Sequence, residues 1–150
     1  MKLEGRPNIP KSILFMCRMN SVRSPVAEIL ARRMLPPTVF VASAGVRAGD
    51  PDPFVEAVLA EEGLSLGERV PHTLDELEDD YFDLVITLAP EAHHAALELT
   101  RSMAIEVEYW PTLDPTVATG TREQILLGYR DMRDRLKARI RARFAPDLPE

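Results

Sequence analysis

The only cysteine of the chain, Cys17, stands six residues before Arg23, and Ser24 follows this arginine directly. A loop of five residues between them can turn its backbone N–H groups inward and form a concave nest for an anion. Arg23 can grip two oxygens of that anion bidentately, which a lysine cannot do. The N–H groups and a hydroxyl from Ser24 or Ser21 would stabilise a thiolate at the base of the nest. The spacing therefore predicts a cysteine nucleophile that acts on an oxyanion.

The sequence on either side of this loop predicts the elements that position it. Residues 12–17 form a short, continuous apolar run, as in a strand that is buried on both faces of a parallel sheet. Ser24-Pro25 offers an N-cap and a proline at the first position of a helix, and Pro36-Pro37 ends that helix. The loop thus joins the carboxyl end of a strand to the start of a helix, where open parallel sheets bind their ligands.

Strand and helix patterns alternate along the rest of the chain. We expect further strands over residues 38–42, 82–88 and 105–110, helices starting at Asp52-Pro53 and Pro90, and a short capped helix over 73–77. The last helix has an apolar stripe at steps of three and four residues, formed by Ile125, Tyr129, Met132, Leu136, Ile140 and Phe144. This order predicts an α/β fold, a single-domain three-layer sandwich with a four-stranded parallel sheet and helices on both faces.

The length of 150 residues fits one domain, which we expect over residues 12–144, with an N-terminal extension at 1–11 and a flexible tail at 145–150. A single cysteine excludes an intramolecular disulfide and a four-cysteine metal site. The N-terminus has no signal-peptide core, and no stretch approaches the roughly 20 apolar residues of a membrane span. We therefore expect a cytoplasmic protein without membrane contact.

The net charge of −6 is unevenly distributed along the chain. Residues 1–49 carry eight basic and two acidic residues, whereas residues 50–108 carry two basic and sixteen acidic residues. The acidic middle argues against a nucleic-acid surface, and the basic first third can attract a small anion. Seven Lys and Arg residues from Arg130 to Arg143 are expected to form a solvated helix face. His93 and His94 have no cysteine or paired carboxylate near them in sequence, so we expect no metal site there.

The segment from Cys17 to Pro25, placed after a first strand, resembles the phosphate-binding loop of the low-molecular-weight protein tyrosine phosphatase superfamily. That superfamily also contains arsenate reductases with the same fold. Further matches follow in order, and the resemblance covers residues 12–144: Ser43-Ala44-Gly45, Pro51-Asp52-Pro53, His72 and Asp114-Pro115.

The resemblance implies a role for each matching residue. Cys17 would attack phosphorus in line, while Arg23 and the loop amides hold the equatorial oxygens. Asp114 would protonate the leaving oxygen and then activate the water that hydrolyses the phosphocysteine. The guanidinium and the amides supply the positive field, so no metal or other cofactor is expected. The phosphate-binding loop would comprise Arg18, Met19, Asn20, Ser21, Val22, Arg23 and Ser24.

The resemblance also implies a supporting layer behind the loop. Ser24 would stabilise the thiolate, and Asn20, Ser43 and His72 would hold the loop in shape. The sequence leaves plainer interpretations open, because Ser43 also suits a strand exit and His72 a buried, hydrogen-bonded histidine. Asp114-Pro115 is also a common turn sequence.

Two departures from the family pattern bear on the substrate. Met19 stands where the family usually has glycine, which suits a backbone that lies close to an anion. Thr116 and Val117 follow Asp114-Pro115, where the phosphotyrosine enzymes typically carry aromatic residues. Trp110 could form an aromatic wall instead, although core packing is the stronger expectation.

The sequence therefore favours a cysteine-dependent phosphomonoester phosphatase that acts on a phosphorylated protein or a small phosphoester through a phosphocysteine intermediate. An arsenate reductase is the alternative, and it would need an external low-molecular-weight thiol because the chain lacks the further cysteines of a disulfide relay. An oxyanion-binding pseudoenzyme is the third possibility. We expect a monomer or a weak dimer.

Overall fold

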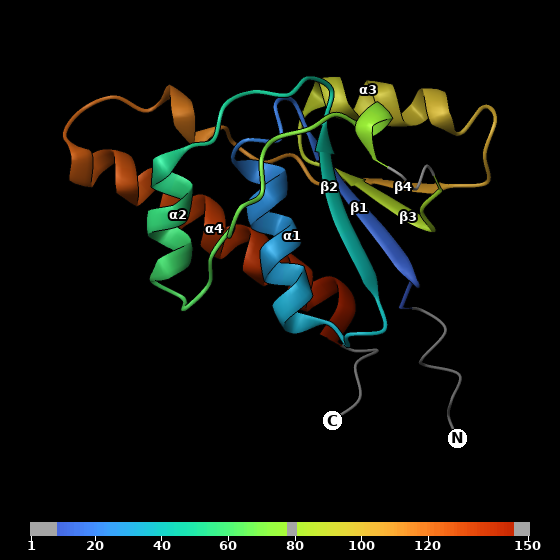
Figure 1. The fold of residues 1–150 in the computed structure, drawn as a ribbon, viewed down its shortest axis with the longest axis horizontal. Helices are drawn as coiled ribbons and strands as arrows, with labels where there is room; N and C mark the ends of the chain where they lie inside the picture. Colours follow the sequence, from blue (N-terminus) through green and yellow to red (C-terminus); the bar gives the residue numbers. More distant parts are fainter. Residues whose placement is uncertain (1–8, 78–80, 146–150) are drawn as a thin grey trace.

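The computed structural model describes residues 9–77 and 81–145, so residues 1–8 of the expected extension and 146–150 of the expected tail lie outside the described residues. Strands and helices alternate along the chain (Figure 1). The strands are β1 (Ser12–Cys17), β2 (Phe40–Gly45), β3 (Leu84–Thr87) and β4 (Glu106–Tyr109). The helices are α1 (Arg23–Met34), α2 (Pro53–Ala60), α3 (Pro90–Leu99) and α4 (Arg122–Phe144), with 3-10 turns η2 (Leu74–Glu76) and η3 (Pro115–Val117).

The four strands form one parallel sheet in the order β2-β1-β3-β4. Cys17 ends β1 opposite Gly45, the last residue of β2. Thr87 at the end of β3 lies opposite Tyr109 at the end of β4. All four carboxyl ends therefore meet at one edge, and the loops that follow them share the same end of the molecule. The predicted α/β fold with a four-stranded parallel sheet is confirmed.

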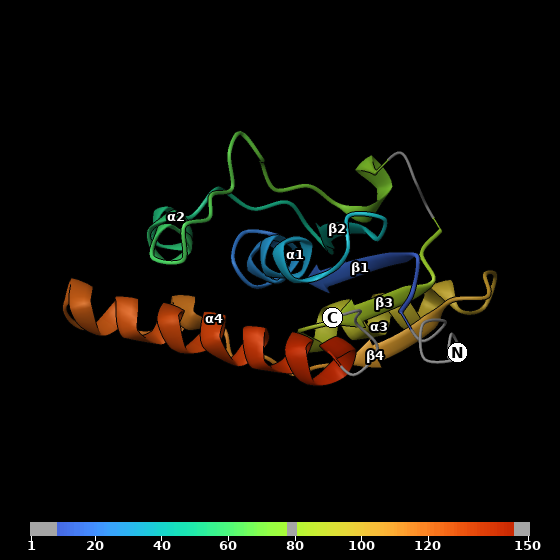
Figure 2. The same ribbon diagram turned by 90° about the horizontal axis from the view of Figure 1, so that it is seen from below.

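Helices cover both faces of the sheet, as expected (Figures 1 and 2). Alternate residues of β1 point to opposite faces, which produces two apolar clusters. Ile13, Phe15 and Cys17 belong to the cluster with α1, α2 and α4. Leu14 and Met16 belong to the smaller cluster, which α3 covers. Cys17 thus points toward the face that carries α1.

The start of α1 differs from the prediction. The helix begins at Arg23, and Val22 occupies the N-cap position without a side-chain cap. Ser24 lies inside the first turn, where its hydroxyl oxygen is 2.9 Å from the Cys17 sulfur. The prediction of Ser24 as the N-cap was wrong, because its hydroxyl lies against the Cys17 sulfur instead of capping the helix. Pro25 still fits, since the amides of a first helical turn have no intrahelical partner.

The apolar stripe of α4 is confirmed from Tyr129 to Phe144, with Leu126 buried and Ile125 only half-buried. The expectation of a solvated basic face is partly wrong, because several arginines of this helix pair with the acidic middle of the chain. Arg133 bonds Glu61 at 2.7 Å, and Arg130 bonds the same carboxylate at 2.9 Å. Among the described residues, no helix is long and apolar enough to cross a membrane.

Candidate active site

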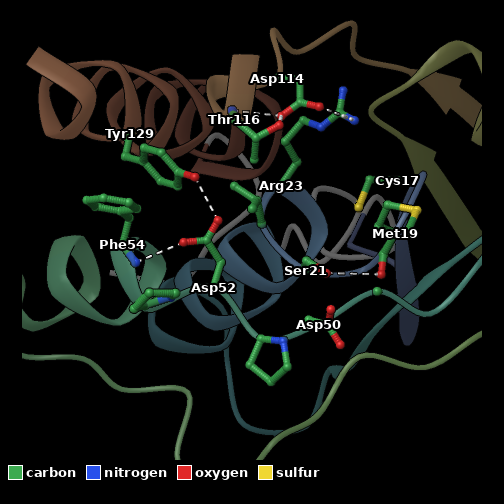
Figure 3. Close-up of a pocket in the computed structure, with 14 residues that line it drawn as sticks. Cys17, Met19, Ser21, Arg23, Asp50, Asp52, Phe54, Asp114, Thr116 and Tyr129 are labelled. Atoms are coloured by element: carbon green, nitrogen blue, oxygen red, sulfur yellow. Dashed lines mark hydrogen bonds and ion pairs between the residues drawn. The ribbon is translucent and has the colours of Figure 1, made fainter. Parts of the chain in front are cut away.

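Cys17 lies at the floor of a cleft of about 410 Å³, at the carboxyl edge of the sheet (Figure 3). Its side chain is almost fully buried, with 2% of the residue exposed. The sulfur lies 2.9 Å from the hydroxyl oxygen of Ser24, and the backbone N–H of Asn20 donates to it at 3.3 Å. The loop of residues 17–24, here called the Cys17 loop, thus curls around its own cysteine. The Ser24 hydroxyl and the Asn20 amide thus both lie within hydrogen-bond distance of the sulfur.

The supporting residues expected behind the loop lie together in the structure. Asn20 has φ of 55°, in the left-handed region that asparagine tolerates better than most residues. Its side-chain amide donates to the hydroxyls of Ser24 at 2.9 Å and Ser43 at 3.0 Å. The backbone N–H of His72 donates to the Asn20 side-chain oxygen at 3.0 Å, and the His72 ring lies 2.6 Å from the Ser43 carbonyl oxygen. His72 therefore reaches the loop through its backbone.

A second segment, residues 46–49, braces the Cys17 loop from outside. Its amides at Val46, Arg47 and Gly49 donate to the carbonyl oxygens of residues 17, 18 and 19 at 3.2, 2.9 and 2.9 Å. These three carbonyl groups therefore point to the bracing segment. The amides of Met19, Ser21 and Val22 have no acceptor among the described residues.

Gly45 allows this close approach, and we expect Gly45→Ala to destabilise the protein. A Cβ at this position would lie 2.3 Å from the Arg47 carbonyl oxygen and 2.7 Å from the Asn20 amide nitrogen. Overpacking of this kind costs about 1–3 kcal/mol. Urea unfolding would measure the loss, with Gly128→Ala as the control, because a Cβ there meets only one atom, at 4.0 Å. Equal stabilities of the two variants would contradict this account of Gly45.

Arg23 and Asp114 meet at the mouth of the cleft (Figure 3). One guanidinium nitrogen of Arg23 donates to the Thr112 carbonyl oxygen at 3.0 Å, and another lies 3.8 Å from the Asp114 carboxylate. The other carboxylate oxygen of Asp114 accepts from the amide and the hydroxyl of Thr116, at 2.9 and 2.7 Å. Thr116 thus holds the carboxyl group in one orientation. The cleft above Cys17 is therefore lined by three loops that are distant in sequence: the Cys17 loop, residues 49–52 and residues 114–116.

Residues 12–144 match the low molecular weight phosphotyrosine protein phosphatase family. This chain belongs to that family. An arsenate reductase from Bacillus licheniformis is 33% identical to it over 135 residues, or 90% of this chain and 95% of that protein. A solved arginine phosphatase from Geobacillus stearothermophilus superimposes with a TM-score of 0.74 at 25% identity, covering 91% of both chains. A tyrosine phosphatase from Erwinia amylovora shares the fold, with a TM-score of 0.73 at 23% identity and 95% coverage of both chains.

Two helices supply an aromatic wall of the cleft, although the sequence pattern predicted one of its residues, Tyr129, to face the core. Phe54 of α2 and Tyr129 of α4 line the cleft, with ring centroids 5.2 Å apart. Asp52 joins them, accepting from the Phe54 amide at 2.8 Å and from the Tyr129 hydroxyl at 2.7 Å. Burial and the neighbouring Asp52 carboxylate raise the pKa of Tyr129, so its hydroxyl stays protonated and remains a donor. Trp110 is 2% exposed and belongs to the core, as expected.

Not every residue of the predicted phosphate-binding loop presents its side chain to the cleft. Met19, Ser21 and Val22 line it, whereas Asn20 and Ser24 lie buried behind it. Arg18 is exposed at the rim, 4.0 Å from Glu91 of α3. The Met19 side chain is accommodated by Gly49 on the bracing segment, where an added Cβ would lie 3.1 and 3.2 Å from two Met19 carbons.

His93 has a packing role. Its ring nitrogen lies 3.0 Å from the Thr87 hydroxyl, and its ring stacks on Tyr109 with centroids 4.5 Å apart. Within residues 9–77 and 81–145, no group of three or more His, Cys, Asp or Glu side chains is placed to hold a metal ion.

Proposed function

We propose that this chain is a phosphomonoester phosphatase with Cys17 as its nucleophile, Arg23 as its oxyanion clamp and Asp114 as its general acid. The observation that carries the proposal is the placement of the Cys17 sulfur, with Ser24 at 2.9 Å and the Asn20 amide at 3.3 Å. The sulfur lies at the floor of a cleft, and Arg23 and Asp114 lie at the mouth of the same cleft. A buried thiol serving only to pack would not require this set of polar neighbours.

The reaction divides into two steps. The Cys17 sulfur attacks phosphorus, and the S–P bond forms as the P–O bond to the leaving group breaks; Asp114 gives its proton to the leaving oxygen. Water then attacks the phosphocysteine, Asp114 takes up its proton, and the S–P bond breaks to release phosphate. Arg23 and the amides of Met19, Ser21 and Val22, which donate to no other group among the described residues, would hold the transferring oxygens.

Phosphate-ester hydrolysis and covalent catalysis can both be tested with p-nitrophenyl phosphate. We expect vanadate-sensitive hydrolysis and, after rapid mixing, a burst of p-nitrophenol that approaches the enzyme concentration. p-Nitrophenolate leaves readily, so hydrolysis of the phosphocysteine is expected to be the slower step. Hydrolysis that vanadate does not inhibit would contradict the proposal. If phosphate raises the melting temperature while turnover stays at background, the chain is an oxyanion-binding pseudoenzyme.

The natural substrate is a phosphorylated protein or a small phosphoester, taken up by a cytoplasmic monomer or weak dimer without a nucleic-acid partner. A substrate panel should contain a phosphotyrosine peptide and, because one relative is an arginine phosphatase, a phosphoarginine peptide. The aromatic wall of Phe54 and Tyr129 can stack on either a phenol ring or a guanidinium group.

We expect Asp114→Asn to separate substrates by their leaving groups. Turnover of alkyl phosphates should fall about 10²–10⁴-fold, because an alkoxide needs a proton to leave. Turnover of p-nitrophenyl phosphate should fall much less, since p-nitrophenolate leaves without one. Steady-state kinetics on both substrates test this, and equal losses would mean that Asp114 only shapes the loop.

Arsenate reduction is the second candidate, because an arsenate reductase is 33% identical over most of this chain. Cys17 would attack arsenic and displace water, and an external thiol would then attack the Cys17 sulfur of the adduct, since no second cysteine exists in the chain. The S–As bond would break as a mixed disulfide forms, and its two electrons would reduce arsenic(V) to arsenite; a second thiol would free Cys17 from the disulfide. Incubation with arsenate plus glutathione or mycothiol should then yield arsenite. Absence of arsenite with every thiol tested would exclude this function.

A further inference from the structure

A fully buried carboxylate, Glu28, lies behind the supporting layer of the Cys17 loop. It belongs to α1 and has 0% of its surface exposed. One of its oxygens accepts from the Ser43 hydroxyl at 2.6 Å and from the Arg69 guanidinium at 2.6 Å. The other oxygen pairs with Arg32 at 2.8 Å. A buried carboxylate requires such partners, and the two ion pairs offset the cost of burying its charge.

An ionised carboxylate can only accept hydrogen bonds, and this fixes the role of its neighbour. The Ser43 hydroxyl must give its hydrogen to Glu28, so the Ser43 oxygen can only accept from the amide of Asn20. At the other end, the backbone N–H of His72 can only donate. It therefore holds the Asn20 carbonyl oxygen on its own side and turns the NH₂ group toward the serines.

The two hydrogens of the Asn20 amide are then both assigned, one to Ser43 and one to Ser24. Ser24 accepts from Asn20, so its own hydrogen is free to be donated. Two acceptors lie within reach, the Cys17 sulfur at 2.9 Å and the Ala44 carbonyl oxygen at 3.5 Å. The sulfur is the closer of the two, so we expect the Ser24 hydroxyl to point to it.

We infer that Glu28 and Arg69 are positioning residues for Cys17. Glu28 supplies the terminal acceptor of a hydrogen-bond chain that runs through Ser43, Asn20 and Ser24 and directs the Ser24 hydroxyl to the sulfur. Arg69 donates to the same Glu28 oxygen as Ser43 and holds that oxygen in place. The inference rests on the proposed role of Cys17 as the nucleophile.

Arg69 connects the hydrogen-bond chain to a segment that is distant in sequence. It is 41 residues from Glu28 and precedes His72 by three residues, so one extended segment after α2 supports both ends of the hydrogen-bond chain. Arg32 is a different case, because its side chain is 49% exposed and also donates to the Val41 carbonyl oxygen at 2.9 Å. Arg33, the next residue of α1, is exposed and provides the control for Arg69.

The decisive variant is Glu28→Met/Arg69→Met, which replaces the buried pair by apolar side chains of similar length. Replacing both partners of a buried ion pair is often neutral for stability, whereas removing one leaves an unpaired charge. The readout is the rate of Cys17 alkylation by iodoacetamide as a function of pH, which does not depend on turnover. Without the acceptor at the end of the hydrogen-bond chain, we expect the midpoint of this profile to rise by about one pH unit. Below the midpoint, alkylation of Cys17 should then be roughly tenfold slower than in wild type.

Three further variants keep the test informative. Glu28→Gln retains an oxygen acceptor for Ser43 and should stay within about threefold of wild type. Arg33→Met, on the exposed side of the same helix, should leave the profile unchanged. Ser43→Ala interrupts the chain at another point and should reproduce the shift even if the double variant does not fold.

A double variant that unfolds at the wild-type urea concentration and keeps the wild-type alkylation profile would overturn the inference. So would a tenfold loss in Glu28→Gln, because the acceptor would then not be the property that matters. Failure of the proposed function has a different signature, since the protein would then show these alkylation shifts without hydrolysing any phosphate ester.

Discussion

Replacing Cys17 by serine should lower kcat for p-nitrophenyl phosphate by at least about 10⁴-fold, because loss of a covalent nucleophile leaves only the contribution of binding. A serine hydroxyl at this position is not ionised at neutral pH, and no histidine base lies among the residues that line the cleft. The p-nitrophenol burst should disappear in the same variant. Steady-state and rapid-mixing kinetics of wild type and Cys17→Ser measure both effects.

Phosphate binding provides the control for this variant. The amides of the Cys17 loop and Arg23 remain, so phosphate should still raise the melting temperature of Cys17→Ser. At 100 times its dissociation constant, a ligand adds about 2.7 kcal/mol to the free energy of unfolding. Hydrolysis that survives the substitution, in a variant that binds phosphate normally, would show that Cys17 is not the nucleophile.

Arg23→Lys should lower kcat by about 10²–10³-fold, the usual cost of losing a donor that stabilises transition-state charge. The planar guanidinium now reaches the Thr112 carbonyl oxygen and the Asp114 carboxylate with separate nitrogens, at 3.0 and 3.8 Å. An ammonium group keeps the charge but presents no fork to two oxygens. The loss should therefore appear in kcat as well as in KM.

A second arginine of α1 serves as the control for Arg23→Lys. Arg33 lies on the exposed side of the same helix, so Arg33→Lys should leave both kcat and KM unchanged. If Arg23→Lys retains more than about a third of the wild-type kcat, the charge alone is sufficient and the bidentate grip has no role in catalysis.

The parts of this fold that could be predicted from sequence are those encoded by local patterns. The apolar run at residues 12–17 and the stripe along α4 specify their elements without information from elsewhere. The spacing of Cys17 and Arg23 predicted the loop because both residues belong to one strand–loop–helix unit. The boundaries were less accurate. Strand β2 starts at Phe40 rather than at residue 38, since its pairing with β1 begins at Ser12.

The parts that could not be predicted depend on contacts between distant segments. Tyr129 belongs to the core-facing stripe of α4, and only the packing of α2 on α4 places it beside Phe54 along the cleft. The pairing of Glu28 with Arg69 spans 41 residues and leaves no local signal. Ser24 was read as a helix cap because Ser-Pro is a common cap sequence, and the nearby sulfur changed its role.

The bracing of the Cys17 loop by residues 46–49 gives the closed loop a measurable signature in the absence of any ligand. The side chains of Val46 and Arg47 are exposed, yet the amides of Val46, Arg47 and Gly49 are bonded to loop carbonyl oxygens. Hydrogen–deuterium exchange should therefore be slow at three positions of a surface segment that would otherwise exchange rapidly. Opening of the Cys17 loop would release all three amides together, so their common exchange rate reports how often this loop opens around Cys17.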